Sequence, residues 1–203
     1  MYVSIVKPLF DFLIALTLGV FVFPLCLIIS LVLFVEHNGK VFFIQERAKK
    51  GGGAFSIIKF RTLLEINTEE AGSDEYHLTK FGNFLRSTSL DELPQLLNVL
   101  KGDMSLIGPR PLFMKYNEKY TKTHKQRLDV KPGITGWAQI HGGNELTWEQ
   151  KFDLDVWYVA NMSFIVDINI LFRTISYLFF NIDLKSKTHM SAKEFKGNLN
   201  TEG

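Results

Sequence analysis

Cysteine is almost absent from this 203-residue sequence, which has Cys26 alone, so no disulfide can form within the chain. We interpret this as typical of a body that faces a reducing compartment such as the cytoplasm. Charge of one sign is not in excess either, because 23 lysines and arginines face 21 aspartates and glutamates. A net charge of +2 gives no bulk attraction to polyanions, so no nucleic-acid partner is predicted.

Several motifs of enzyme chemistry are also missing. The sequence has no Walker motif, no dinucleotide-binding glycine pattern and no G-x-S-x-G nucleophile motif. Its five histidines lack metal-ligand spacing and have no cysteine partner nearby, so a zinc site is not expected. The features left to explain are an apolar N-terminal run, a pair of carboxylates and several cationic side chains.

Charged residues are absent from the 24 residues between Phe12 and Val35. About 20 apolar residues let a helix cross a hydrocarbon core of about 30 Å. Pro24 divides the run into two halves, each roughly 17 Å long as a helix. Two geometries fit: a kinked helix that spans the membrane, or a helix that breaks at Pro24 and returns to the same side. Hydropathy alone favours the spanning helix.

The rest of the chain predicts a compact body. Alternating apolar and polar residues around a glycine-rich turn predict a β-hairpin over 41–61, and the polar residues 65–78 predict a loop. Helices are expected over 90–100, 114–129, 147–162 and 164–181. The last of these combines apolar helical spacing with Asp167 and Arg173, which favours a helix lying on a membrane surface.

Two basic stretches have alternative interpretations. The turn Lys49–Gly53 could cradle a phosphate with its N–H groups, although a plain hairpin turn is the simpler reading. A second stretch could either face anionic lipid headgroups or form a solvated helix face. Its members are Lys115, Lys119, Lys122, Lys125, Arg127 and Lys131.

Asp91 and Glu92 are adjacent carboxylates within "RSTSLDELPQLLNVL", which predicts a helix with a buried stripe of Leu90, Leu93, Leu97 and Leu100. Ser89 and Glu92 match a capping box. A helix that begins near Pro94 is the alternative, and it would leave both carboxylates in the preceding turn. Adjacent carboxylates repel unless a cation joins them, and Arg86 or Mg²⁺ could do so.

Arg110 lies in Gly-Pro-Arg-Pro, a stiff setting with little conformational freedom. A guanidinium held in this way can bind a phosphate in a fork, and an exposed arginine in a turn is the alternative.

Four segments carry a resemblance to a known family: "QERAKKGGGAFSIIKFRT", "KFGNFLRSTSLDELPQLLNVLKGDMSLIGPRPL", "RLDVKPGITGWAQI" and "LTWEQKFDLDVWYVANMS". In this order they resemble the bacterial sugar transferase family, the monotopic phosphoglycosyl transferases, over roughly residues 5–180.

The resemblance implies an α+β, mostly helical monotopic membrane protein with interfacial amphipathic helices. It implies a re-entrant helix over 1–36 that is broken at Pro24, in place of the spanning helix. A catalytic domain over 37–184 would face the cytoplasm at the bacterial inner membrane, and residues 185–203 would form a mobile tail. Phe23 stands where the family usually has serine, which could satisfy a carbonyl freed by the proline.

The resemblance also implies the reaction. The family transfers a sugar 1-phosphate from a UDP-sugar to undecaprenyl phosphate with Mg²⁺ and releases UMP. Asp91 matches the family's nucleophile, which forms a covalent phosphosugar intermediate, and Glu92 matches the adjacent glutamate of the family's catalytic dyad. We expect both carboxylates to hold Mg²⁺. The expected substrate-binding residues are Arg86, Arg110, Lys59, Arg61 and Asp155.

Specificity and partners follow as further expectations. We expect a UDP-N-acetyl amino sugar as donor, the lipid bilayer as a partner, and downstream glycosyltransferases that use the product. A UDP-hexose donor is an alternative, and so is a non-catalytic scaffold of a glycan assembly complex. Gly143 occupies a position where the family commonly has arginine, so Lys131 or His141 could substitute.

Overall fold

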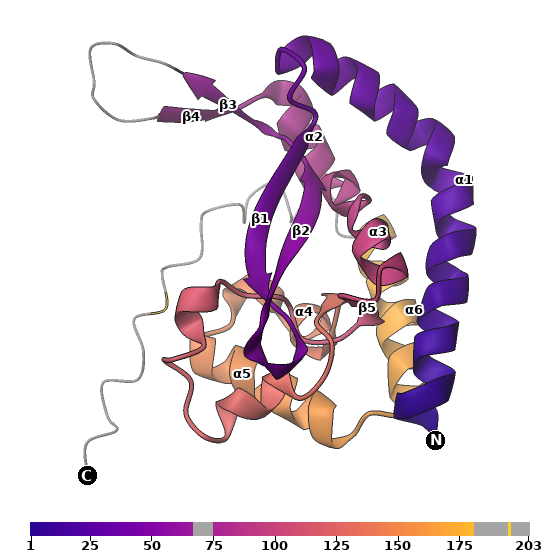
Figure 1. Cartoon of the computed structure of the whole chain (residues 1–203), viewed down its shortest axis with the longest axis vertical. Helices are drawn as coiled ribbons and strands as arrows, with labels where there is room; N and C mark the ends of the chain where they lie inside the picture. Colours follow the sequence, from indigo (N-terminus) through magenta and orange to yellow (C-terminus); the bar gives the residue numbers. More distant parts are fainter. Residues whose placement is uncertain (67–74, 181–194, 196–203) are drawn as a thin grey trace.

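The computed structural model describes residues 1–66, 75–180 and Phe195. A long helix, α1, runs along one side of a body made of three two-stranded sheets and shorter helices (Figure 1). The helices are α1 (Lys7–Glu36), α2 (Lys80–Ser87), α3 (Gln95–Leu100), α4 (Trp137–Ile140), α5 (Trp148–Ala160) and α6 (Phe164–Phe180). The strands are β1 (Phe42–Ala48), β2 (Ala54–Phe60), β3 (Leu63–Ile66), β4 (Glu75–Leu78), β5 (Ser105–Ile107) and β6 (Gly133–Thr135).

Helix α1 continues through Pro24 without interruption, so the expected break into two helices is not present. The helix is visibly curved (Figure 1). An interior proline removes one backbone donor and pushes against the preceding turn, and a long helix can absorb both effects by bending. Whether α1 spans a membrane or returns to one side stays a prediction.

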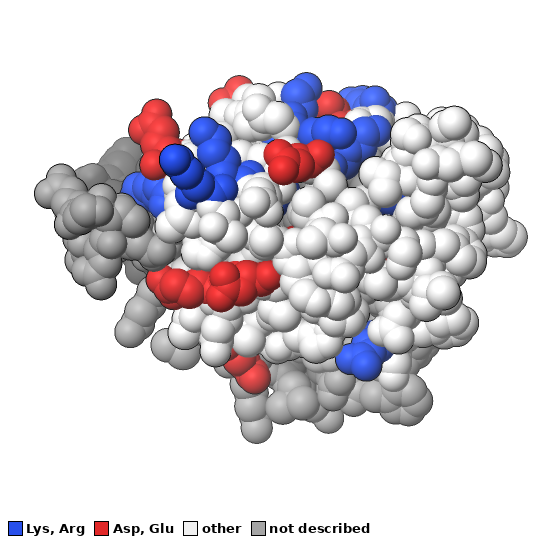
Figure 2. Space-filling model, turned by 90° about the horizontal axis from the view of Figure 1, so that it is seen from below, with Lys and Arg blue, Asp and Glu red and all other residues white. Residues whose placement is uncertain are grey.

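Most of the surface of α1 has no protein partner. Among the described residues it is the one helix, counted from Tyr2 to Glu36, that is long and apolar enough to cross a membrane, and only 11% of its most apolar window is buried. Ala15, Ile29 and Leu33 are the apolar side chains that it buries against the body. From below, the side of the molecule that α1 occupies is largely free of charged side chains (Figure 2).

The predicted hairpin is confirmed. Strands β1 and β2 pair antiparallel from Phe42 opposite Phe60 to Ala48 opposite Ala54. Gly51 and Gly52 lie in the turn with φ of +79° and +81°, a conformation that glycine adopts without steric cost. The loop predicted over 65–78 is wrong at its ends, because β3 and β4 pair antiparallel there, and residues 67–74 lie outside the described part.

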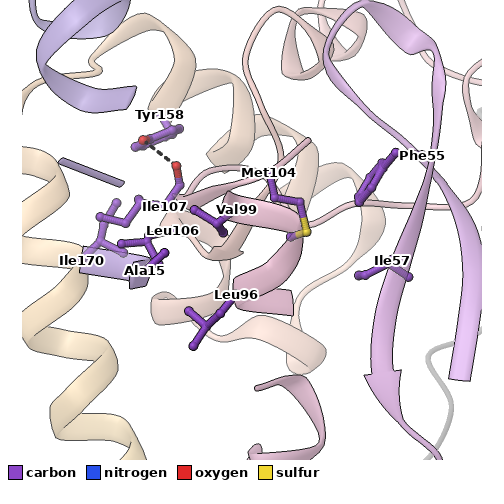
Figure 3. Packing of buried hydrophobic residues seen from close by; sticks show 10 residues of the cluster. All are labelled: Ala15, Phe55, Ile57, Leu96, Val99, Met104, Leu106, Ile107, Tyr158 and Ile170. Atoms are coloured by element: carbon purple, nitrogen blue, oxygen red, sulfur yellow. Dashed lines mark hydrogen bonds between the residues drawn. The ribbon is translucent and has the colours of Figure 1, made fainter. Parts of the chain in front are cut away.

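The main core lies where α1, α3, β2, β5, α5 and α6 meet (Figure 3). Its buried side chains are Ala15, Phe55, Ile57, Leu96, Val99, Met104, Leu106, Ile107, Tyr158 and Ile170. The Tyr158 hydroxyl donates to the carbonyl of Ile107 at 3.2 Å, which satisfies a polar group inside this apolar cluster. The core therefore fixes α3 and β2, the two elements that flank the carboxylate pair.

Of the remaining helix predictions, two are confirmed and one is wrong. Helices α5 and α6 confirm the two predicted over 147–162 and 164–181, and Thr147 caps α5 in a reciprocal capping box with Gln150. The helix predicted over 114–129 is wrong: that stretch holds two short 3₁₀ turns, Met114–Tyr116 and His124–Leu128. The predicted mobile tail lies outside the described residues except Phe195, which packs against Tyr116, Trp148 and Phe152.

Candidate active site

Asp91 and Glu92 lie in a 3₁₀ turn, Leu90–Glu92, directly before α3. Ser89 takes a left-handed conformation with φ of +59°, and its side chain makes no capping hydrogen bond, so the capping box is absent. Pro94 is the residue that precedes the first turn of α3. The alternative in which the helix begins near Pro94 is confirmed, and both carboxylates project from the turn before it.

The buried face of α3 differs from the predicted leucine stripe. Gln95, Leu96, Asn98 and Val99 are buried, whereas Leu97 is 49% exposed. The Asn98 amide donates to the carbonyl of Ser56 at 2.8 Å and accepts from the N–H of Ile58 at 3.1 Å. These two bonds attach α3 to β2.

Three cations surround the carboxylate pair. The Lys59 ammonium contacts Glu92 Oε1 at 2.6 Å, and the Arg110 guanidinium contacts the same oxygen at 3.0 Å. Arg86 acts on Asp91 electrostatically, while its Nε donates to the Thr62 hydroxyl at 2.9 Å. Among the described residues, none donates a hydrogen bond to the Asp91 carboxylate. Because Asp91 is also only half-buried, we call its carboxylate open.

The pKa values of the two carboxyl groups shift in opposite directions. Burial raises the pKa of Asp91 to about 6, the negative charge of Glu92 adds to this, and Lys59, Arg86 and Arg110 oppose it. Burial would also raise the pKa of Glu92, but Arg110 and Lys59 outweigh it and lower that pKa to about 2. Glu92 thus stays ionised and holds the cations, whereas Asp91 titrates close to neutral pH.

Two predicted substrate-binding residues, Arg61 and Asp155, are not among the charges that act on Asp91 or Glu92. Arg61 donates from its backbone N–H to Val41, and its charge acts on His37. Asp155 pairs with Arg127 at 2.8 Å, and each of these residues is only 3% exposed. Of the seven predicted site residues, the structure brings together Asp91, Glu92, Lys59, Arg86 and Arg110.

Arg47 and Lys151 are cations near Arg110 that our sequence analysis did not select. The Arg47 guanidinium lies 3.6 Å from the centre of the Phe113 ring. Burial, and then the charge of Arg110, lower the pKa of Arg47 to about 10 and also lower the pKa of Lys151. Arg47 lies in one of the segments that carry the resemblance, but its contact with Phe113 joins residues 66 apart and leaves no local signal.

Glycines allow the Arg110 segment to pass close to the loop before α4. Strand β5 pairs parallel with β6, and a Cβ on Gly133 would lie 2.1 Å from the backbone nitrogen of Gly108. A Cβ on Gly136 would lie 2.2 Å from the carbonyl oxygen of Gly108. Only glycine fits at such distances. The backbones of the "GPRP" and "KPGITGW" segments therefore pack directly against each other.

Gly143, at the position where the family commonly has arginine, lies in a 3₁₀ turn with φ of +51°, and a Cβ there would meet nothing within 4 Å. The proposed substitutes lie elsewhere. The His141 ring bonds to the carbonyl of Trp137 at 2.8 Å, and the Lys131 ammonium lies 3.5 Å from the position of a Cβ on Gly102. Neither is among the cations that act on Asp91 or Glu92.

The donor set limits how a metal could be held. Among the described residues there is no group of three or more histidine, cysteine, aspartate or glutamate side chains that could enclose an ion. Mg²⁺ commonly binds through one or two carboxylates and completes its shell with water and substrate phosphates. Asp91 and Glu92 fit a site of this kind, in which carboxylates hold the ion together with water and substrate phosphates.

The fold and site together define a protein with one exposed apolar helix and a carboxylate pair set among cations, a site suited to anionic substrates. The family profile described as "Bacterial sugar transferase" matches residues 2–181. The chain belongs to the bacterial sugar transferase family.

Relatives named for their activities are among the similar proteins. The chain is 45% identical over 201 residues to "Uncharacterized sugar transferase EpsL" of Bacillus subtilis (strain 168), covering 95% of this chain and 96% of that one. It is 38% identical to the "UDP-glucose:undecaprenyl-phosphate glucose-1-phosphate transferase" of Xanthomonas campestris pv. campestris, covering 85% of this chain and 38% of that one. It is also 38% identical to the "UDP-N-acetylgalactosamine-undecaprenyl-phosphate N-acetylgalactosaminephosphotransferase" of Aeromonas hydrophila, covering 75% and 38%. The chain thus spans about two fifths of the length of these two longer relatives.

Proposed function

We propose that this protein transfers a sugar 1-phosphate from a UDP-sugar to undecaprenyl phosphate and releases UMP. The observation that carries the proposal is the open Asp91 carboxylate beside Glu92, whose charge is bound by Lys59 and Arg110. Relatives named as sugar-1-phosphate transferases acting on undecaprenyl phosphate support it.

The transfer takes place in two displacements at one phosphorus. An oxygen of the ionised Asp91 attacks the phosphorus that bears the sugar, a new O–P bond forms, and the bond to the UMP oxygen breaks. An oxygen of the lipid phosphate then attacks the same phosphorus, and the Asp91 carboxylate leaves with its charge restored. Two steps let a water-soluble donor and a membrane lipid use one site in turn.

Cations make this attack feasible, because a carboxylate and a diphosphate repel each other. Lys59, Arg86 and Arg110 act on Asp91 and could neutralise a diphosphate bound beside it, and Arg47 and Lys151 extend the positive field beyond Arg110. Asp91 and Glu92 would hold Mg²⁺, which supplies further neutralisation of the diphosphate charge when it is bound.

A membrane position fits the lipid acceptor. The exposed apolar surface of α1 requires an apolar environment, and α6 adds Phe164, Ile165, Phe172 and Ile175 as exposed apolar side chains. We place the protein on the cytoplasmic face of the bacterial inner membrane, with α1 embedded and α6 at the interface. Its product would be the substrate of downstream glycosyltransferases.

The donor is either a UDP-N-acetyl amino sugar, as expected from the resemblance, or a UDP-hexose. Relatives named for glucose and for N-acetylgalactosamine support one donor class each. The open space at Gly143, where the family commonly has arginine, is a point at which donor choice could differ.

The test uses the full chain in nanodiscs with undecaprenyl phosphate, Mg²⁺ and a panel of UDP-sugars, and follows UMP release. Asp91→Asn should abolish both UMP release and the covalent adduct seen by intact-protein mass spectrometry, because the amide cannot act as the nucleophile. Asp129→Asn, an exposed aspartate outside the cluster, should behave as the wild type. No UMP from any donor would reject the enzyme and favour the non-catalytic scaffold.

A further inference from the structure

The backbone around Arg110 is held through its carbonyl groups. Pro109 and Pro111 have no N–H to donate, so the segment depends on acceptors. The carbonyl of Pro109 accepts from Gly133 N at 3.0 Å, and the carbonyl of Leu112 accepts from Ala48 N at 2.9 Å. The carbonyl of Arg110 itself, between these two bonds, accepts from the Arg127 guanidinium at 2.7 Å.

Arg127 is itself held rigidly. Its Nε and Nη2 donate to Asp155 Oδ2 at 3.0 and 2.8 Å, and its Nη1 donates to the Tyr120 hydroxyl at 3.1 Å. Its guanidinium carbon lies 5.6 Å from the centre of the Phe152 ring. In the sequence, Arg127 belongs to a basic stretch with several lysines, but at 3% exposure it lies in the interior.

A buried ion pair of this kind adds little to stability. Desolvating both charges offsets most of their attraction, and apolar replacements of such pairs are often neutral. What the pair does provide is a donor with fixed direction, because Nη2 has two hydrogens and shares them between Asp155 and the carbonyl of Arg110.

We propose that Arg127 and Asp155 are positioning residues that fix the backbone at Arg110 and so hold the Arg110 side chain against Glu92. Neither residue touches the reacting atoms. The effect on turnover rests on the proposed function, whereas the effect on Arg110 itself does not.

A double-mutant cycle separates positioning from general destabilisation. In full-length protein in nanodiscs, Arg127→Lys should lower UMP turnover between about tenfold and a hundredfold, since small misplacements of a binding group have effects of this size. In an Arg110→Met background the same change should alter turnover by less than about twofold, because there is no guanidinium left to misplace. In an Arg86→Met background, which does not use this carbonyl bond, the full loss should remain.

A second readout needs no activity. Arg110 labelling by phenylglyoxal, followed by peptide mass spectrometry, should be faster in Arg127→Lys because the pairing with Glu92 is loosened. Lys125→Met, an exposed neighbour on the same 3₁₀ turn, should leave the labelling rate unchanged. If Arg127→Lys does not fold, Asp155→Asn tests the same arrangement with a smaller perturbation.

The outcomes distinguish the two proposals. Equal turnover losses in the wild-type and Arg110→Met backgrounds, or an unchanged labelling rate in the folded variants, would overturn the positioning role. If the wild type releases no UMP from any donor but Arg110 labels faster in the variants, the proposed function fails and the positioning role stands.

Discussion

At the scale of single residues, Asp91 and Glu92 are neighbours whose acidities move in opposite directions. Both are half-buried, so the difference comes from their partners: Lys59 and Arg110 bind one oxygen of Glu92, whereas Asp91 receives no hydrogen bond from the described residues. One carboxylate organises the cations and the other stays open. This division of roles in a matched pair is typical of acidic catalytic sites.

The raised pKa of Asp91 predicts the pH dependence of the first displacement. A carboxyl with pKa of about 6 is protonated below that pH and cannot attack, so adduct formation should rise as pH increases through about 6. Glu92→Gln removes the like charge and leaves Lys59 and Arg110 to act on Asp91. The midpoint should therefore move to lower pH, even though the variant is slower.

The measurement is single-turnover adduct formation by intact-protein mass spectrometry, without the lipid acceptor, across pH 4.5–8. Lys101→Met, an exposed change, should keep the wild-type midpoint. A Glu92→Gln midpoint at or above that of the wild type would show that repulsion from Glu92 does not set the acidity of Asp91.

The residues of the site were predicted better from the sequence than the partners that each of them binds. Asp91, Glu92, Lys59, Arg86 and Arg110 were predicted and lie together. Asp155 was predicted beside them but pairs with Arg127, because the two elements that carry this ion pair meet only in the folded chain. A sequence shows that a carboxylate is present and does not show which of several distant cations will bind it.

At the scale of elements, the site depends on two attachments between distant segments. Asn98 joins α3 to β2, which brings Lys59 to Glu92. The pairing of β5 with β6 brings the Arg110 segment close to the loop before α4. The first attachment uses a side-chain amide and the second uses glycines that allow close backbone approach.

Gly133→Ala should be strongly destabilising. The added Cβ would lie 2.1 Å from the nitrogen of Gly108 and 2.5 Å from the carbonyl oxygen of Thr135, both backbone atoms that cannot move independently. Overpacking of this kind typically costs about 1–3 kcal/mol, and Arg110 should be displaced with it. Thermal unfolding of the purified variant is the measurement.

Gly53→Ala is the matched control for this substitution. Its φ is −70°, and the nearest atom to the new Cβ is the flexible end of Lys49 at 3.5 Å. We expect a change within about 0.5 kcal/mol. Equal stability of the two variants would mean that the backbone contact between Gly108 and Gly133 is looser than these distances indicate.

Local patterns predicted elements well where one segment determines its own structure. The β1–β2 hairpin has alternation and a glycine turn within it, and α5 carries its own capping box. Residues 90–100 were harder, because Pro94 moves the helix start and turns the buried face toward Leu96 and Val99 instead of Leu97. The buried face of α3 is set by packing against β2, and this packing is not visible in the local sequence pattern.

At the scale of the whole molecule, the start of α1 is fixed to the body by buried charges. The Lys7 ammonium contacts Asp167 of α6 at 2.7 Å and Asp11 at 3.6 Å. Asp11 accepts from the Ser105 hydroxyl at 2.7 Å, and Asp167 accepts from the Tyr158 hydroxyl at 2.8 Å. In the sequence, Lys7 and Asp11 are only the charged residues that precede the uncharged run Phe12–Val35.

This network orients α1 relative to the rest of the body. The exposed apolar surface of α1 could be satisfied by lipid at many angles, because the hydrophobic effect is non-directional. The bonds from Lys7 and Asp11 reach α6 and β5 and select one of these angles. The orientation of α1 relative to the body that carries Asp91 is therefore set partly by these buried contacts.

Lys7→Met tests this role. Among the described residues it removes the one cation that pairs with Asp11 and Asp167, and so leaves two buried carboxylates without a charge partner there, which costs about 3–5 kcal/mol in comparable cases. We expect lower thermal stability and faster proteolysis between α1 and the body. Adding Asp167→Asn should restore part of the loss, because the uncompensated charge is removed as well.

Lys101→Met, at an exposed lysine, should behave as the wild type. If Lys7→Met is as stable and as protease-resistant as the wild type, apolar packing of Ala15, Ile29 and Leu33 alone holds α1 in place.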